Sequence, residues 1–432
     1  MSLKLDRLRS AFGELALNRI GILRPLRVRD FRLLWSGMTV SALGDGIYLV
    51  ALAWQVYGLS NTPTALSIVG VAWFLPQIAA TLFGGVLADR IDRRRVMIFA
   101  DVVRSVAIGM IGVLSVTGHL QLWHMWVLVA FYGAGNAVFY PAYTALVPQV
   151  LSKEMLVEAA ALRQFMRPLA YRIIGPALGG VLVGAFGAGT GFLVDAGSFA
   201  ASTAAILLMQ ARPIPRPEGK PVTTILQEMR EGLAFVRSQR WLSTALVAVI
   251  LAMLFYLGPY WVLVPFVVKN QLQGGAGGLG LVLTAGGIGA VLASLAAGQR
   301  GFTRRPLVVV YVTWALAAFG LVGYSFVTHV WEAALVSAVA IGSLVTGQIL
   351  WEALLQRCVP DELLGRVSSV DSFVSSGLVP LSLAITGPVA ASVGAIDTLR
   401  WAGVIAGGIL LAFLLFSLTR RAIEAPAPEP AT

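Results

Sequence analysis

Long apolar stretches, separated by short polar connections, recur along the whole chain. Most have about 20 residues or more, the length that an α-helix needs to cross the hydrocarbon core of a bilayer. The pattern predicts an all-α membrane protein with twelve transmembrane helices. They are expected near residues 33–57, 65–88, 96–117, 123–146, 167–186, 190–210, 242–268, 279–299, 306–327, 331–355, 367–390 and 395–418.

The composition fits a chain that has the bilayer as its solvent. Apolar residues make up 57% of the 432 residues and charged residues only 12%, against about 25% charged residues in soluble proteins. This balance excludes a soluble enzyme and a disordered protein. The single cysteine, Cys358, excludes an internal disulfide, and three scattered histidines are too few for a metal cluster. We therefore expect no metal and no cofactor.

Basic residues alternate strongly between the two sets of connections. Twenty-eight of the 32 Lys and Arg residues fall in one set, whereas the other set holds only Lys269 and Arg400. The positive-inside rule places the first set, with both termini, in the cytoplasm. Because the net charge of +11 is spread over loops, we expect no nucleic-acid partner. Abundant Ala and Gly, and 28 Arg against 4 Lys, favour the cytoplasmic (inner) membrane of a GC-rich bacterium.

The longest connection divides the chain into two sets of six spans. A basic cytoplasmic arm, 1–32, precedes a first six-helix bundle at 33–210, and a second bundle follows at 242–418. The linker 211–241 begins with prolines and continues with helically spaced apolar residues, which predicts an amphipathic helix on the inner membrane surface. The Pro/Ala/Glu-rich tail 419–432 is expected to be disordered.

Three short segments recur in register in the two halves. The matched pairs are 88–95 with 298–305, 152–156 with 360–364, and 174–176 with 386–388. In each half, the first pair lies between the second and third spans, the second pair between the fourth and fifth spans, and the third pair in the fifth span. The repeat predicts two six-helix halves in parallel orientation, which is the architecture of a transporter with its cavity between the halves.

Two motifs resemble signatures of the major facilitator superfamily. The segment from Gly85 to Arg95 resembles the loop signature G-x-L-A-D-R-x-G-R-R/K, except that Asp92 stands where the signature has Gly. Its candidate gating residues, with the polar pair that follows, are Gly85, Asp89, Arg90, Arg93, Arg94, Asp101 and Arg104. The fifth-helix motif of the superfamily's proton-coupled exporters is matched by Gly175, Pro176, Gly179 and Gly180. Segment 357–368 is similar to one common in the branch of macrolide exporters, mycobacterial-type multidrug pumps and the enterobactin exporter.

The resemblance implies the major facilitator fold, two rocking bundles and a monomer. It also implies that the fifth-helix motif seals the inner-half interface against leak, although a kink needed only for packing is the alternative. An ion pair between Asp89 and the loop arginines would tie two helices together in one conformation. Asp101 and Arg104 can pair with each other or extend that network. Alternatively, the arginines only orient the protein.

Asp45 is the sharpest candidate for a proton-coupling acid. It lies roughly 20 Å along the helix beyond Arg32, near the middle of the bilayer. A charge at that depth costs about 2.5–3.5 kcal/mol, so the carboxyl should face the cavity. A carboxyl that loads a proton from one side and releases it on the other is what an antiporter needs. The alternative is a structural acid bonded to a neighbouring helix. Gly44 and Gly46 allow close packing or local bending.

Four other intramembrane charges are weaker candidates for coupling or for substrate contact, namely Asp195, Arg172, Glu352 and Asp371. A structural or gating role is favoured for Glu352 and Asp371, and the roles of the other two stay open. Polar and aromatic residues at mid-depth predict a largely apolar cavity that suits bulky amphipathic molecules. They are Tyr48, Gln55, Trp73, Gln77, Tyr132, Asn136, Tyr140, Tyr256, Tyr260, Trp261 and Gln348.

The sequence has neither a phosphate-binding loop of the form G-x-x-x-x-G-K-[ST] nor an H-E-x-x-H motif, which argues against ATP-driven transport and a membrane hydrolase. We expect a secondary active transporter, a proton-coupled antiporter that exports amphipathic small molecules such as drugs or siderophore-like compounds. Protons, the substrate and membrane lipids would be its partners. A lipid or lysolipid flippase and a substrate importer are the alternatives. A channel is disfavoured because it does not need two related halves.

Overall fold

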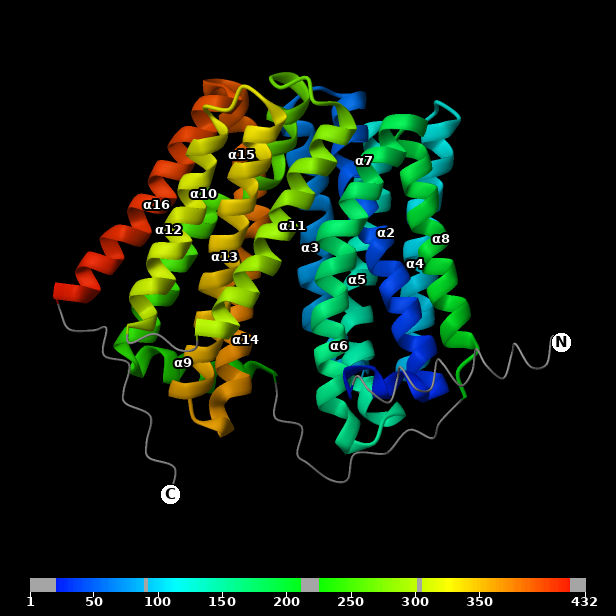
Figure 1. The fold of residues 1–432 in the computed structure, drawn as a ribbon, viewed down its shortest axis with the longest axis horizontal. Helices are drawn as coiled ribbons and strands as arrows, with labels where there is room; N and C mark the ends of the chain where they lie inside the picture. Colours follow the sequence, from blue (N-terminus) through cyan, green and yellow to red (C-terminus); the bar gives the residue numbers. More distant parts are fainter. Residues whose placement is uncertain (1–20, 89–91, 211–224, 301–304, 420–432) are drawn as a thin grey trace.

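The computed structural model describes residues 21–88, 92–210, 225–300 and 305–419, and this part of the chain is helical without a strand. Twelve of its helical segments are long and apolar enough to cross a membrane, which confirms the predicted number of spans. Figure 1 shows them as two side-by-side groups, one from each half of the chain.

The first half holds six spans after a short 3-10 helix. The fifth span is the composite of η2, α6, η3 and α7, and η3 is a π-helix. The elements are η1 (Gly21–Arg27), α2 (Arg29–Leu59), α3 (Pro63–Ala88), α4 (Arg93–Val116), α5 (Leu122–Val150), η2 (Lys153–Met155), α6 (Leu156–Pro168), η3 (Leu169–Ile174), α7 (Gly175–Phe186) and α8 (Ala188–Leu207).

The second half repeats this order after the linker helix, and its fifth span combines α14 with α15. The elements are α9 (Ile225–Ser238), α10 (Arg240–Asn270), α11 (Gly275–Arg300), α12 (Pro306–Tyr324), α13 (Val330–Cys358), α14 (Asp361–Gly377), α15 (Val379–Val393) and α16 (Ala395–Thr419). An ion pair of 2.6 Å between Glu231 and Arg366 holds α9 against α14.

Corresponding helices of the two halves share their lengths and their ends. Both α2 and α10 have 31 residues, and both α5 and α13 have 29 residues and begin with a capping box. Gly187 ends α7 and Gly394 ends α15 with φ values of 82° and 92°, a conformation that glycine adopts without steric cost. These matches extend the repeat seen in the sequence to the level of helix boundaries.

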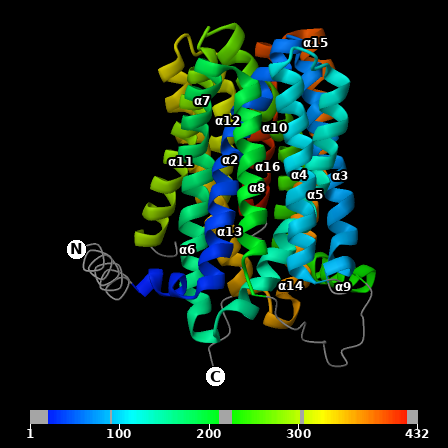
Figure 2. The ribbon, with the colours of Figure 1, turned by 90° about the vertical axis from the view of Figure 1, so that its right-hand side faces the viewer.

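The side on which α2 begins and α16 ends is called the terminal side below, and the opposite side is called the far side. Figure 2 shows α9 and α14 at the terminal side of the molecule. The two halves meet mainly through α7 against α11 and α3 against α15. These contacts are close because small residues form them: Gly180 faces the Cα of Gly280, and Gly387 faces Ser67.

Helix packing within the second half is tightest between α11 and α13. A Cβ atom on Gly289 would clash with the backbone carbonyl of Ala338, whereas a Cβ on Gly298 of the same helix would meet open space. Backbone, unlike a long side chain, has no alternative rotamer with which to move aside. The crossing of α11 and α13 therefore depends on the absence of a side chain at Gly289.

Gly289→Ala is expected to destabilise the protein by about 1–3 kcal/mol because the helices must move apart. Gly298→Ala is the matched control, since it adds the same methyl group to the same helix without a clash. Thermal unfolding in detergent measures both effects. Equal unfolding temperatures for the two variants would contradict the packing described for Gly289.

Candidate functional site

Asp45 lies near the middle of α2, and its side chain is partly exposed. The hydroxyl of Tyr132 on α5 donates a hydrogen bond of 2.7 Å to its Oδ1 atom. Asp45 is thus bonded to a neighbouring helix, as the structural alternative requires. Its role in proton coupling stays a prediction.

The two glycines that flank Asp45 let other helices approach it on both sides. A Cβ atom on Gly44 would clash with the carboxylate of Asp195 on α8. A Cβ on Gly46 would lie 2.8 Å from the Cα of Gly175 and 3.0 Å from the ring of Pro176. The segment 44–46 thus works by close packing, which brings the second carboxyl and the fifth-helix motif to the same level of α2.

Asp195 is fully buried, in contrast to Asp45. Its Oδ1 atom accepts a hydrogen bond of 3.3 Å from Ser198, and its Oδ2 atom has no hydrogen-bond partner in the described part of the chain. A buried carboxylate with an unsatisfied oxygen is costly. Asp195 is therefore held in an environment that favours an added proton or a nearby cation.

Arg104 of α4 is the buried cation of this region. Its guanidinium pairs with Asp101, donates a hydrogen bond of 2.8 Å to Asn136, and lies between the rings of Phe139 and Phe199. Both members of the Asp101–Arg104 pair are buried inside the first half. Of the two alternatives for this pair, the geometry therefore supports mutual pairing.

The described first half thus gathers three carboxyl groups around one buried guanidinium. Arg104 interacts electrostatically with Asp45, Asp101 and Asp195, and the exposed Arg167 is a further cation close to Asp45. A single guanidinium cannot neutralise three ionised carboxylates in a medium of low dielectric constant. In this cluster the three carboxyl groups outnumber the two nearby guanidinium groups, and only one of those guanidinium groups is buried.

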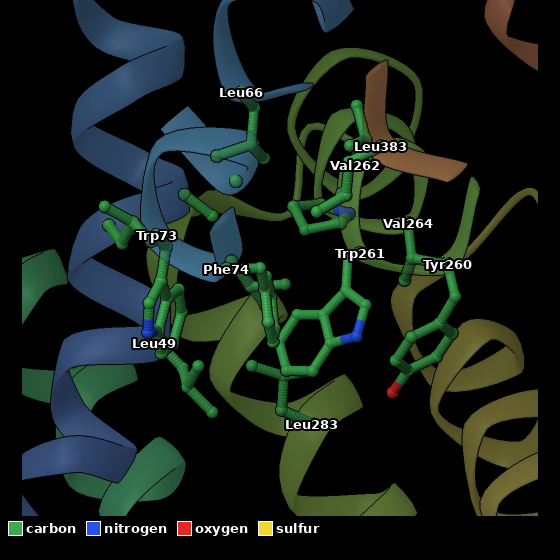
Figure 3. Close-up of a pocket in the computed structure, with 15 residues that line it drawn as sticks. Leu49, Leu66, Trp73, Phe74, Tyr260, Trp261, Val262, Val264, Leu283 and Leu383 are labelled. Carbon is green, nitrogen blue, oxygen red and sulfur yellow. The ribbon is translucent and has the colours of Figure 1, made fainter. Parts of the chain in front are cut away.

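An aromatic cluster connects Asp45 with a pocket between the two halves. Tyr48 lies 4.6 Å from Tyr132 and 5.4 Å from Trp73, measured between ring centroids. Trp73 stacks on Phe74, and both rings line the pocket. Figure 3 shows α3 residues Trp73 and Phe74 on one side of it and α10 residues Tyr260 and Trp261 on the other.

Hydrogen bonds join the two halves on the far side of this pocket. Tyr57 donates a bond of 2.6 Å to the carbonyl of Val262, and Lys269 donates to the carbonyl of Tyr57. Asn61 and Asn270 donate to each other's oxygens at 2.7 Å and 3.2 Å. We call these five residues the far-side lock. The described conformation is therefore closed on the far side.

The fifth-helix motif sits where α7 meets both α2 and α11. Gly175 and Gly179 pack against α2, whereas Gly180 packs against α11 of the other half. The resemblance implied a seal in the inner half of the interface. Here the motif extends from the level of Asp45 towards the far side, because α7 runs in that direction from Gly175. The motif closes the same end of the interface as the far-side lock.

Pro176 also explains the π-helix η3 that precedes it. Proline has no N–H and its ring excludes the carbonyl four residues earlier, so the regular ladder is interrupted at Arg172. The backbone N–H of Gly175 bonds instead to the carbonyl of Ala170. In α11, Thr284 donates a bond of 3.2 Å to the carbonyl of Ile173, and Gly287 lies against that of Arg172. The second half thus covers the irregular turn of the first.

The described end of the loop signature, residues 92–95, makes contacts inside the first half. Arg93 donates to the carbonyl of Ala145 at 3.0 Å, and Arg94 donates to two carbonyls at the end of α8. Asp92, the departure from the signature, is the N-cap of α4, a role that Asp fills well. Gly85 belongs to α3. Asp89 and Arg90 lie outside the described residues, and with them the predicted gating pair.

The remaining predicted residues are spread over the interface and the second half. Arg172 is exposed and interacts electrostatically with Tyr256 and Tyr260. Asp371 accepts a hydrogen bond of 3.1 Å from the indole of Trp351. Glu352, the next residue after Trp351 in the chain, is exposed.

The predicted cavity residues differ in burial. Tyr48 and Tyr256 are buried, Gln77 and Asn136 are partly exposed and Gln348 is exposed. In the described part of the chain, no hydrogen bond or ion pair joins Arg172, Glu352 or Asp371 to the carboxyl cluster of the first half.

Several functional contacts were not foreseen from the sequence. The hydrogen bond from Ser198 to Asp195 could not be predicted without knowing which face of α8 packs against α2. The far-side lock uses Tyr57 and Lys269, which as helix-end residues resemble ordinary interfacial anchors. Its one sequence signal is that Asn61 and Asn270 lie close to the ends of the corresponding helices α2 and α10.

Two related six-helix halves, with a polar cluster inside the first and an apolar pocket between them, are the arrangement of a transporter of the major facilitator type. The nucleoside transporter NupG has the same fold, with a TM-score of 0.71 over 89% of this chain and 98% of that chain at 11% identity. A POT family transporter, solved with a thioalcohol-conjugated peptide, gives a TM-score of 0.69 over 90% and 96% of the two chains at 13% identity.

Residues 20–430 match the family of transmembrane secretion effectors, and the chain belongs to this family. It is similar to the multidrug efflux pump Tap of Mycolicibacterium fortuitum, with 28% identity over 84% of this chain and 89% of that protein. Macrolide efflux protein A of Streptococcus pyogenes is 24% identical over 84% and 90%. The enterobactin exporter EntS of Citrobacter koseri is 25% identical over 93% and 95%. The chain is a multi-pass membrane transporter with efflux proteins as relatives, and not an enzyme.

The far-side lock predicts that a covalent link between Asn61→Cys and Asn270→Cys stops transport. A short thiol-to-thiol cross-linker is applied in a Cys358→Ser background, because the native thiol would otherwise react as well. Cross-linked protein, identified by intact mass, should lose transport because the halves cannot separate on the far side. Each single-cysteine variant serves as the control. Transport at the parental rate by cross-linked protein would contradict a lock that has to open.

Proposed function

We propose that this chain is a proton-coupled antiporter that exports amphipathic small molecules by alternating access. It would act as a monomer in the cytoplasmic membrane of a bacterium, with both chain ends in the cytoplasm. The strong bias of Lys and Arg towards the terminal side supports this orientation. With that orientation, the far-side lock closes the outer side of the described conformation.

The observation that carries proton coupling is the environment of Asp45. Three carboxyl groups share the buried Arg104, and Asp45 is the one of them that is partly exposed. In the inward-facing state it would give up its proton to the cytoplasm. After the far side opens it would take up a new proton from outside. Asp195 is fully buried, and its carboxyl would hold a proton or a nearby cation within the cluster.

The aromatic cluster supplies a physical link between proton and substrate. Tyr132 bonds to Asp45 and contacts Trp73 at 5.4 Å, and Trp73 lines the pocket between the halves. A molecule in the pocket would contact Trp73 and displace Tyr132. Because Tyr132 donates a hydrogen bond to Asp45, this displacement would change the stability of the ionised carboxylate. The reciprocal effect, in which protonation alters binding in the pocket, follows from linkage.

The direction and the broad substrate class rest on the pocket and on the relatives. Its walls are apolar and aromatic, so they favour molecules with extended apolar surface over sugars. The similar proteins named above are a multidrug pump, a macrolide efflux protein and a siderophore exporter. Export of amphipathic compounds is the function that agrees with both observations.

Asp45→Asn is expected to abolish substrate-driven proton flux, because the amide cannot bind and release a proton at this position. Purified protein is reconstituted into proteoliposomes that carry a pH-sensitive dye, and a panel of macrolides and lipophilic dyes is added. Asp397→Asn is the control, since this acid is exposed at the far side and pairs only with Arg400 in the described structure.

Persistence of flux in Asp45→Asn with the same pH dependence as the parent would remove Asp45 from the coupling step. Translocation of fluorescent lipid in the same vesicles, without drug-driven proton flux, would instead identify a flippase. Inward accumulation of substrate under an inward proton gradient would identify an importer.

A further inference from the structure

The pocket between the halves carries information on the charge of its ligand. It has about 610 Å³ of unfilled space, part of it open to solvent, and its fifteen lining residues include no charged side chain. Leucines from α2, α3, α11 and α15 form much of the wall, together with Trp73, Phe74 and Trp261.

Two of the three polar side chains of the pocket lie on one short segment of α10, and the third, Trp73 of α3, has a buried indole N–H without a hydrogen-bond partner among the described residues. Trp261 contributes an indole N–H, which only donates, and Tyr260 contributes a hydroxyl. Neither side chain makes a hydrogen bond with any other residue that the structure describes. Pro265, which also lines the pocket, has no N–H, so the carbonyl of Trp261 lacks its usual helical partner. These groups are available to a ligand.

A charged ligand group would be poorly compensated in this pocket. Neither Asp45 nor Asp195 lines the pocket, and Tyr132, which bonds to Asp45, packs against the lining ring of Trp73. Aromatic faces attract cations, but most of the wall is aliphatic and offers a cation nothing in exchange for its water. An oxygen that accepts a hydrogen bond has a donor at Trp261.

We propose that this pocket binds an uncharged, largely apolar molecule through a carbonyl or ether oxygen that accepts a hydrogen bond from the indole N–H of Trp261. This deepens the proposed function, because the pocket is the substrate site of the proposed exporter. Trp261 is then the specificity-determining residue, and the ring faces of Trp73 and Phe74 hold the apolar body of the ligand.

The test uses four small fluorescent probes with purified protein in nanodiscs and no proton gradient. The uncharged 7-diethylamino-4-methylcoumarin has a lactone carbonyl, and N-phenyl-1-naphthylamine is uncharged without a carbonyl. Rhodamine 6G is a cation and fluorescein is an anion. Partition into lipid is subtracted with empty nanodiscs. We expect the coumarin to bind most tightly and the two charged probes to bind at least tenfold more weakly.

Trp261→Phe keeps a ring and removes the N–H, so it should weaken coumarin binding roughly 3- to 10-fold and leave N-phenyl-1-naphthylamine unchanged. Trp331→Phe, at an exposed tryptophan remote from the pocket lining, should leave both unchanged. Leu283→Trp fills the pocket and should abolish binding of both uncharged probes. Thermal unfolding of each variant verifies its fold.

Coumarin binding that is equal in the parent and in Trp261→Phe would overturn the role of the indole N–H. Tighter binding of rhodamine 6G or fluorescein than of the coumarin would overturn the assignment to uncharged ligands. Because binding is measured without a gradient, either result stands apart from the fate of the antiport mechanism. If the parent protein shows no substrate-driven proton flux but Trp261→Phe still weakens coumarin binding, the antiporter is refuted and the assignment of the pocket stands.

Discussion

A carboxylate at the middle of a bilayer persists only where the protein itself supplies the hydrogen bonds and the counter-charge that water would give. Asp45 obtains a hydrogen bond from Tyr132, and the packing of Gly44 against Asp195 brings a second acid beside it. Arg104 is the buried cation of this group and pairs with Asp101, and its guanidinium lies against two phenylalanine rings. Four helices of the first half, α2, α4, α5 and α8, are thereby tied to one polar centre. The contacts that pack these four helices together are therefore also the contacts that form the polar site.

Much of the architecture followed from sequence, because a bilayer imposes length and polarity rules that a single chain displays openly. The twelve spans were predicted on this basis, and the structure confirms their number. The fifth and eleventh spans nevertheless begin at Lys153 and Asp361, well before the apolar stretches do. Hydropathy identifies the membrane-embedded part of a helix, whereas capping and local hydrogen bonds determine the residue at which the helix begins or ends.

The site was less predictable, since helical rotation and tilt decide which side chains meet. Asp45 was identifiable because an acid between two glycines is rare in an apolar span. The position of Asp195 directly against Gly44 was not, because it depends on where α8 crosses α2. The far-side lock depends on backbone carbonyls of Tyr57 and Val262, which no pattern of side chains reveals. The π-helix before Pro176 was likewise hidden, as proline predicts an interruption but not its form.

The structural repeat places Tyr256 of α10 at the position that Asp45 holds in α2, since both lie in helices of 31 residues at the same distance from the start. The two halves have therefore diverged at their centres: one holds a charged cluster, and the other presents Tyr256 and Tyr260 as stacked rings. Under the proposed mechanism, substitutions at these aromatic positions would alter which compounds bind and leave the acidic cluster intact. A lineage could then gain tolerance to unfamiliar toxins through few substitutions.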